Sequence, residues 1–214
     1  LHAFSHCLKL LWRDKLGQIS LATTTLFWGA GATLQFIVIK WAEHALHLDL
    51  SKASMLQGVV AIGVAIGAVL AARMVTMKSS VSVIPLGIAM GVIVNVMIFV
   101  TDMGVAMALM VLIGALSGFF VVPMNALLQH RGHILMGAGH SIAVQNFNEQ
   151  ACILALGAFY TGLTRVGLSA FGAITIFGVL VAGTMGVIAL WHRRNTRLHG
   201  VEVDRLLAIA RSDH

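Results

Sequence analysis

The sequence predicts an all-α membrane protein with six transmembrane helices. Of its 214 residues, 58% are hydrophobic and only 10% are charged, whereas about a quarter of an average soluble domain is charged. The mean hydropathy is +0.91, and the apolar residues form long runs without the alternation of β-barrel strands. So few charges cannot cover a soluble globular domain, so lipid must be the main solvent.

The first 18 residues predict an amphipathic helix that lies on the membrane and leads into the first span. Its apolar residues recur at helical spacing and are interrupted by charges: Leu1, Phe4, Leu8 and Leu11. No signal-peptide pattern is present in this segment. Because residue 1 is a leucine, we expect the chain to be processed or to be a fragment.

Six segments are long enough to cross a bilayer as helices, which takes about 20 apolar residues. They are Ile19–Ile39, Ser54–Met77, Val81–Val100, Met103–Leu128, Ile142–Leu163 and Ser169–Trp191. Only Thr101 and Asp102 separate the third and fourth segments, which predicts a tight helical hairpin. The expected organisation is an amphipathic linker helix at 1–18, a six-helix bundle at 19–191 and a basic cytoplasmic tail at 192–214.

The basic residues predict that both termini lie in the cytoplasm. Because six spans place both termini on one side, the loops can be compared by their Lys and Arg content. The terminal side carries eleven: Lys9, Arg13, Lys15, Arg73, Lys78, Arg131, Arg193, Arg194, Arg197, Arg205 and Arg211. The other side carries three: Lys40, Lys52 and Arg165. The basic residues lie between long apolar runs, as expected for loops at an anionic membrane surface rather than for a nucleic-acid site. Four residues of one loop are expected to meet lipid phosphates: Arg131, His130, His133 and His140.

Small residues recur inside the spans. Gly63–Gly67, Gly87–Gly91 and Gly114–Gly118 are Gly-x-x-x-Gly pairs, which are typical of helices whose backbones pack closely. General packing within the bundle is the favoured interpretation, and dimerisation is the alternative. Pro85 and Pro123 fall within predicted spans, where we expect each to kink its helix.

The most unusual stretch is in the fifth span, where five of the six residues from Gln145 to Gln150 are polar. Glu149 is the only acidic residue deep within a predicted span. A charge at that depth normally faces protein or a water-filled cavity. Asn146 and the other polar residues share a broad helix face with Glu149. The pattern predicts a transport pathway or a switch, and an interhelical hydrogen-bond cluster or buried ion pair is the structural alternative.

Two further spans carry candidate pathway residues. The first span has a stripe of moderate polarity at i, i+4, i+7 and i+11: Thr24, Trp28, Gly31 and Gln35. This stripe either lines a cavity or packs against a neighbouring helix. In the fourth span, Asn125 follows Pro123, where it lines the cytoplasmic mouth or satisfies carbonyls that the proline leaves free.

Sequence motifs of catalysis and cofactor binding are absent. Two histidine pairs at i, i+3 spacing have no suitable cysteine or carboxylate cluster nearby, so they predict no metal site. The sequence contains no phosphate-binding loop, dinucleotide fingerprint or nucleophile elbow. A membrane-embedded lipid-modifying enzyme would need a nucleophile with a base, or a metal cluster, within the spans, so these absences argue against an enzyme, and no cofactor is expected.

Three stretches resemble bacterial lysophospholipid transporters of the major facilitator superfamily. Residues 25–36 (TLFWGAGATLQF) are similar to the first span of the C-terminal half of those proteins. Residues 118–129 (GFFVVPMNALLQ) resemble its fourth span, and residues 137–146 (GAGHSIAVQN) resemble the loop and start of the fifth. The resemblance covers about residues 10–192, in order and without large gaps.

The six segments form two sets of three, and because three is odd the second set would enter the membrane from the opposite side, which is the 3+3 inverted repeat of major facilitator halves. The resemblance implies that this chain supplies spans seven to twelve and lacks an N-terminal six-span half. It implies alternating-access transport of lysophosphatidylethanolamine-type lipids across the bacterial inner membrane toward the cytoplasmic leaflet. An acyltransferase–acyl-ACP synthetase is the implied partner there. Another amphipathic substrate or a drug is the alternative.

The resemblance also assigns the substrate pathway. It places Trp28, Gln35, Asn125, Gln145, Asn146 and Glu149 along the central cavity, beside the Thr24 position of the first-span stripe. Some relatives carry a basic residue where this chain has Gln35. If that residue binds the lipid phosphate, this protein must use another donor or recognise its headgroup differently.

Overall fold

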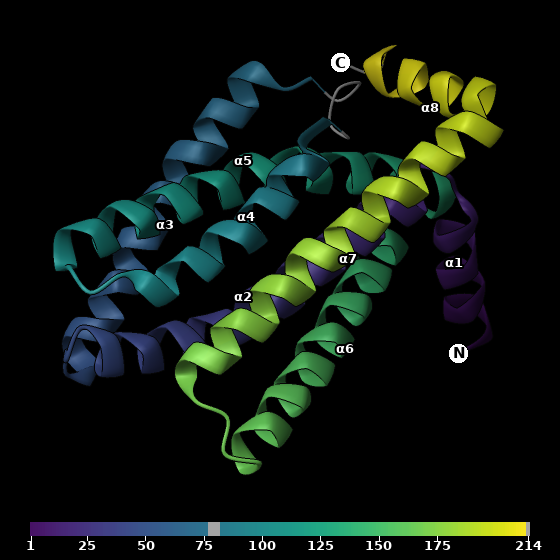
Figure 1. The fold of residues 1–214 in the computed structure, drawn as a ribbon. Helices are drawn as coiled ribbons and strands as arrows, with labels where there is room; N and C mark the ends of the chain where they lie inside the picture. The colour runs from purple at the N-terminus through teal and green to yellow at the C-terminus, as the bar shows by residue number, and fades with distance from the viewer. Residues whose placement is uncertain (77–81, 213–214) are drawn as a thin grey trace.

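The computed structural model describes residues 1–76 and 82–212, and the regular elements within them are helices (Figure 1). In chain order they are α1 (His2–Arg13), α2 (Gly17–Ala45), α3 (Leu50–Met74), α4 (Ile84–Val96), the 3₁₀ helix η2 (Met97–Phe99), α5 (Met103–Met136), α6 (Ala138–Arg165), α7 (Ala170–Leu198) and α8 (Gly200–Ser212). Val81, Met77 and Lys78, which belong to the predicted second and third spans and their loop, lie outside the described residues.

Among the described helices, α2, α3, α5 and α7 are long and apolar enough to cross a membrane. Ile84–Phe99, which combines α4 and η2, is a shorter apolar helix. Helix α6 has 28 residues but carries the polar stretch 145–150. The all-α membrane class is therefore confirmed, whereas the number of spans stays a prediction that depends on α4 and α6.

The predicted hairpin between the third and fourth spans is confirmed. The Asp102 side chain accepts a hydrogen bond from the Val105 backbone N–H at 3.1 Å and so caps the start of α5. The kink expected at Pro85 is wrong, because Pro85 lies in the first turn of α4. A proline there removes an N–H that has no intrahelical partner in any case.

The long helices pack mainly on partners that are not their neighbours in the sequence. Helix α3 packs along α5, α4 along α7, and α2 along α6. Helix α2 also contacts α7 and α5, which places it inside the bundle. Figure 1 shows the side-by-side course of α4 and α7.

Two of the predicted Gly-x-x-x-Gly pairs face each other across α3 and α5. A Cβ added at any of these glycines would collide with the opposite backbone: Gly63 and Gly67 with Val111 and Ala115, and Gly114 and Gly118 with Val60 and Val64. Gly91 on α4 meets Gly178 and Ala182 on α7 in the same way. Close helix packing at small residues is therefore confirmed.

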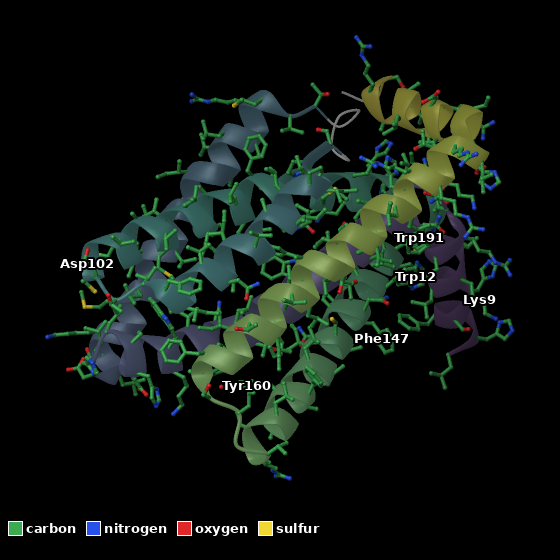
Figure 2. All side chains as sticks on the ribbon, in the orientation of Figure 1. Lys9, Trp12, Asp102, Phe147, Tyr160 and Trp191 are labelled. Atoms are coloured by element: carbon green, nitrogen blue, oxygen red, sulfur yellow. The ribbon has the colours of Figure 1, made fainter. Side chains whose placement is uncertain are left out.

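Helices α1 and α8 cover one end of the bundle. Figure 2 shows Lys9, Trp12 and Trp191 at this end and Asp102 at the opposite end. On α8, Val203 and Leu206 are buried against Leu16 and Leu127. The tail, predicted from its charge alone, thus contains an amphipathic helix that rests on the bundle.

Helix α1 turns its apolar side toward the bundle. Cys7 and Leu11 belong to a buried cluster with residues of α2, α5 and α6: Leu21, Leu128 and Val144. The rings of Phe4 and Phe147 meet edge to face, with their centroids 5.3 Å apart. Of the predicted apolar stripe, Leu11 is therefore buried on protein and Phe4 and Leu8 are partly buried there, whereas Leu1 is exposed.

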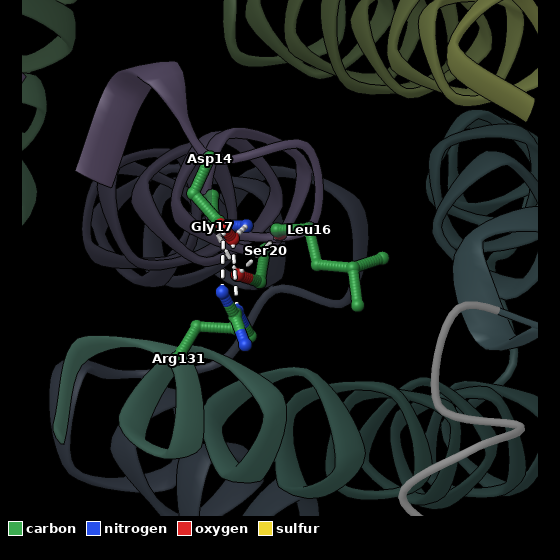
Figure 3. Close-up of polar contacts among 5 residues, drawn as sticks. All are labelled: Asp14, Leu16, Gly17, Ser20 and Arg131. Atoms are coloured by element: carbon green, nitrogen blue, oxygen red, sulfur yellow. Dashed lines mark hydrogen bonds and ion pairs between the residues drawn. The ribbon is translucent and has the colours of Figure 1, made fainter. Parts of the chain in front are cut away.

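A buried ion pair joins the α1–α2 turn to α5 (Figure 3). Arg131 donates from Nε to Asp14 Oδ2 at 3.0 Å and from Nη2 to Asp14 Oδ1 at 2.7 Å. The Gly17 backbone N–H also donates to Asp14 Oδ2, at 2.7 Å. The two charged side chains are only 5% and 9% exposed. Arg131 is therefore not available to lipid phosphates, and that expectation is wrong.

The α3–α5 contact predicts a large difference between two glycine substitutions on α3. Gly67→Val should destabilise the protein by about 1–3 kcal/mol or more, because its Cβ would meet the Ala115 backbone. Gly58→Val is the matched control, since a Cβ at Gly58 meets nothing within 4 Å. Unfolding in detergent, followed by circular dichroism, measures both. Equal losses would contradict the packing described here.

The Asp14–Arg131 pair predicts a strong and non-additive effect on stability. Asp14→Ala should cost about 3–5 kcal/mol, because it leaves the Arg131 guanidinium buried without its partner. The double variant Asp14→Ala/Arg131→Met should recover part of that loss, which a double-mutant cycle would measure. Arg13→Ala, an exposed neighbour on α1, is the control. A cost below about 1 kcal/mol for Asp14→Ala, the usual value of an exposed pair, would be the contrary result.

Candidate functional site

An apolar cavity of about 460 Å³ lies within the bundle and is lined by residues of α2, α3, α4, α5, α6 and α7. This volume lies within the range of roughly 300–1,000 Å³ that is typical of small-molecule sites. The lining is mostly aliphatic side chains, methionines and glycines. Ser117 is also there, but its hydroxyl donates to the Ile113 carbonyl at 2.7 Å. The cavity can therefore hold an apolar group and offers it few polar partners.

The stripe on α2 divides between the cavity and the helix interior. Trp28, Gly31 and Gln35 line the cavity. Thr24 does not: it is buried, and its hydroxyl donates to the Ser20 carbonyl at 2.8 Å. The stripe thus gives the cavity one wall, and Thr24 lies one turn beyond it.

Gln57 on α3 is a lining residue that sequence reasoning missed. Its Nε2 donates to the backbone carbonyl of Gln35 at 3.3 Å, which brings two glutamines together at the cavity. A signal was present, because Gln57 is the only amide side chain in the second predicted span. The cavity thus has the amide groups of Gln35 and Gln57 in its lining, and no basic side chain at position 35.

Asn125, Gln145 and Glu149 form a hydrogen-bonded cluster between α5 and α6. Gln145 Nε2 donates to Glu149 Oε1 at 2.9 Å and reaches Asn125 Oδ1 at 3.4 Å. Gln145 is buried, whereas Asn125 and Glu149 are half-buried. Three of the predicted pathway residues therefore meet, in the interhelical arrangement that was the structural alternative.

This cluster lies near one end of the cavity without lining it. Asn125 follows the cavity residue Val121 by four positions, and Glu149 precedes the cavity residue Ile153 by four. Four residues advance a helix by about 6 Å and return to nearly the same face. The cluster consequently lies about one turn beyond the cavity, on the side where α1 and α8 pack.

The other polar residues of the stretch 145–150 lie at more exposed positions than Gln145. Asn146 and Gln150 are exposed, and Asn148 donates to the Val144 carbonyl of its own helix at 2.8 Å. Within the described residues, α6 buries only Ser141, Val144 and Gln145. Exposed amides on a membrane helix require water or further protein beside them, because lipid cannot satisfy them.

Comparisons of the sequence with curated proteins identify relatives of this chain. The chain is 42% identical over 167 residues to "Lysophospholipid transporter LplT" of Pectobacterium carotovorum subsp. carotovorum (strain PC1), which is 78% of this chain and 41% of that protein. The chain is a homologue of the lysophospholipid transporters. The transporter of the same name from Shigella boydii serotype 4 (strain Sb227) is 40% identical over 194 residues, which is 90% of this chain and 49% of that protein.

The transporter from Yersinia pestis (strain Pestoides F) is 44% identical over 165 residues, 77% of this chain and 40% of that protein. The chain thus spans less than half the length of the curated lysophospholipid transporters that it matches. No protein-family model and no solved structure matches it. The relatives are named as transporters.

The cavity of this lysophospholipid transporter homologue predicts the effect of filling it. Gly31 lines the cavity and has nothing within 4 Å of an added Cβ, so Gly31→Leu should fold normally. The leucine should nevertheless weaken binding of an apolar molecule in the cavity about tenfold, an effect of roughly 1.4 kcal/mol. A detergent with a brominated alkyl chain would report binding by quenching of tryptophan fluorescence. Gly58→Leu, outside the cavity, is the control, and equal quenching in the two variants would contradict the prediction.

Proposed function

We propose that this chain is the C-terminal six-span half of a lysophospholipid transporter. The single observation that carries the proposal is an apolar cavity with a polar cluster about one helical turn beyond it. A lysophospholipid has one acyl chain and one polar headgroup, so each part finds a chemically matched partner. A small sugar would leave the apolar lining of the cavity unused.

The helix pairing supports a 3+3 inverted repeat. Exchanging α2, α3 and α4 with α5, α6 and α7 converts the α2–α6 contact into the α5–α3 contact. The same exchange leaves the α4–α7 contact unchanged. A bundle built from two equivalent triplets of opposite orientation has this property, as do the halves of major facilitator transporters.

The exposed polar side of α6 supports a missing second half. Asn146 and Gln150 would face lipid if this bundle were alone, which is unfavourable for amides. An N-terminal six-span half would cover them or enclose water beside them. The length of the relatives, more than twice the matched segment, is consistent with such a half.

The proposed transport cycle follows from these positions. Rocking of the two halves would open the cavity alternately to each side of the bacterial inner membrane. The positive-inside bias assigns the end with α1 and α8 to the cytoplasm. The lipid would therefore pass from the cavity to the Asn125–Gln145–Glu149 cluster and on to the cytoplasmic leaflet, where an acyltransferase–acyl-ACP synthetase would reacylate it.

The proposal predicts that Glu149→Ala reduces lysophospholipid uptake more than it reduces the amount of protein in the membrane. Removal of a charge-assisted hydrogen-bonding group from the pathway should lower uptake about tenfold or more. The measurement is uptake of labelled lysophosphatidylethanolamine by spheroplasts that express the protein with both halves, normalised by immunoblot.

Gly58→Ala, at a position outside the cavity and the cluster, is the control and should transport normally. Parallel losses of uptake and abundance in Glu149→Ala would give Glu149 a structural role. Normal abundance with uptake of a drug but of no lysophospholipid would favour the alternative substrate class.

A further inference from the structure

The outer face of α7 is apolar along the bundle and basic at its end. Between positions 176 and 192, the exposed residues of α7 recur at i, i+4, i+8 and i+11 and form an outer stripe: Val179, Gly183, Val187 and Leu190. The same period continues to Arg194 and Arg197, which are both exposed. A helix places residues at this spacing on one face, so the two arginines lie directly beyond the outer stripe.

The opposite face of α7 belongs to the cavity. The α7 residues that line it are Ile174, Gly178, Val181 and Met185. Helix α7 therefore separates the cavity from the surface of the bundle. The outer stripe exposes only aliphatic side chains and a glycine, unlike the exposed amides of α6, so acyl chains solvate it well.

The outer arginines continue into a basic corner where α7 turns into α8 (Figure 1). An open hollow of about 700 Å³ lies at this α7–α8 corner. Its lining residues are Arg197, Leu198, His199, Gly200, Val201, Glu202 and Arg205. No ion pair within residues 1–76 and 82–212 uses Arg197 or Arg205. Leu198 and Val201 are exposed beside them, Val201 to 87%. Basic and apolar side chains together are typical of a surface that contacts lipid headgroups.

Packing of α8 on the bundle keeps this corner in place. Val203 and Leu206 on the inner face of α8 are buried against Leu16 and Leu127. Arg205 lies between them in sequence and is exposed. Because the helix is already fixed, a ligand at the corner would pay little conformational entropy for ordering it.

Trp191 indicates the depth of the corner in the membrane. Indole side chains are enriched where the hydrocarbon meets the headgroups. Trp191 is half-buried and lies at the end of the bundle with α1 and α8 (Figure 2). Arg194 and Arg197 follow it by about 4.5 and 9 Å along the helix. A lipid whose acyl chains contact Val187 and Leu190 therefore has its phosphate within reach of both arginines.

We propose that the outer stripe and the α7–α8 corner bind an anionic phospholipid of the surrounding membrane, which stays on the protein and is not transported. Its acyl chains lie along α7, and its phosphate accepts charge-assisted hydrogen bonds from Arg194, Arg197 and Arg205. A zwitterionic choline lipid would bring a cation of its own toward these arginines, so the site favours a net negative headgroup. The site lies outside the cavity, and the inference therefore does not depend on the molecule that the cavity carries.

The test measures lipid binding to the protein with both halves, purified in a neutral detergent, by native mass spectrometry. Phosphatidylglycerol and phosphatidylcholine with the same acyl chains are titrated separately. Wild-type protein should bind one phosphatidylglycerol about tenfold more tightly than phosphatidylcholine, because two or more cations face the phosphate. Arg197→Gln/Arg205→Gln should remove this preference and leave phosphatidylcholine binding unchanged. Arg165→Gln, which removes an arginine from the last turn of α6, is the control and should retain the preference.

Two further variants test the position of the lipid. Glu202→Gln should tighten phosphatidylglycerol binding, because it removes a carboxylate from the lining of the hollow. Gly183 leaves a notch between Val179 and Val187, since a Cβ added there meets nothing within 4 Å. Gly183→Leu should therefore fold normally, which circular dichroism checks, and should weaken the binding of both lipids by filling the notch.

The contrary outcomes are distinct from one another. Equal binding of the two lipids by wild-type protein would overturn the site, as would an unchanged preference in Arg197→Gln/Arg205→Gln. Equal weakening of both lipids by that variant would give the arginines a structural role and overturn it as well. Glycerol 1-phosphate, which has the phosphate but no acyl chain, should not displace phosphatidylglycerol. Displacement at equal concentration would assign the corner to a soluble phosphate instead of a lipid.

Discussion

In lipid there is no hydrophobic driving force for helices to associate, because acyl chains solvate a leucine as well as another leucine does. Close backbone contact must then hold the bundle, and the glycines of α3 and α5 allow it. Gly91 does the same between α4 and α7. The cavity depends on these contacts, since helices fixed where their backbones touch do not collapse into the space between them. The apolar lining would otherwise gain dispersion energy by closing.

Two carboxylates near the same end of the bundle differ in how many hydrogen bonds they accept from the protein. Asp14 accepts two hydrogen bonds from Arg131 and one from the Gly17 backbone, so its oxygens are fully used. Glu149 accepts one from a neutral amide and is only half-buried. The first carboxylate fixes the position of α1 relative to α5. The second retains the capacity to bind something else.

Local patterns predicted the features that depend on one helix. Periodicity identified the stripe of α2, glycine spacing identified the close-packing faces, and the brevity of the segment around Asp102 identified the hairpin. Contacts between distant positions had no local signal. Asp14 and Arg131 are 117 positions apart, so Arg131 looked like one more basic residue of a cytoplasmic loop. Gln57 is the only amide in its predicted span, but its role at the cavity depends on a contact with Gln35 on another helix. Helix α8 was missed because the tail was considered only for its charge.

The non-sequential pairing of the helices has a consequence for how the protein enters the membrane. The main partner of α3 follows it by two helices, and the partner of α4 follows by three. Both helices must therefore be stable in lipid before their partners are synthesised. Their almost uninterrupted apolar sequences make this possible. Helix α6, the most polar of the long helices, has the opposite situation: α2 and α5 both precede it. The most polar of the long helices thus enters the membrane only after its two packing partners are present. The order of the helices therefore limits the exposure of polar side chains to lipid during insertion.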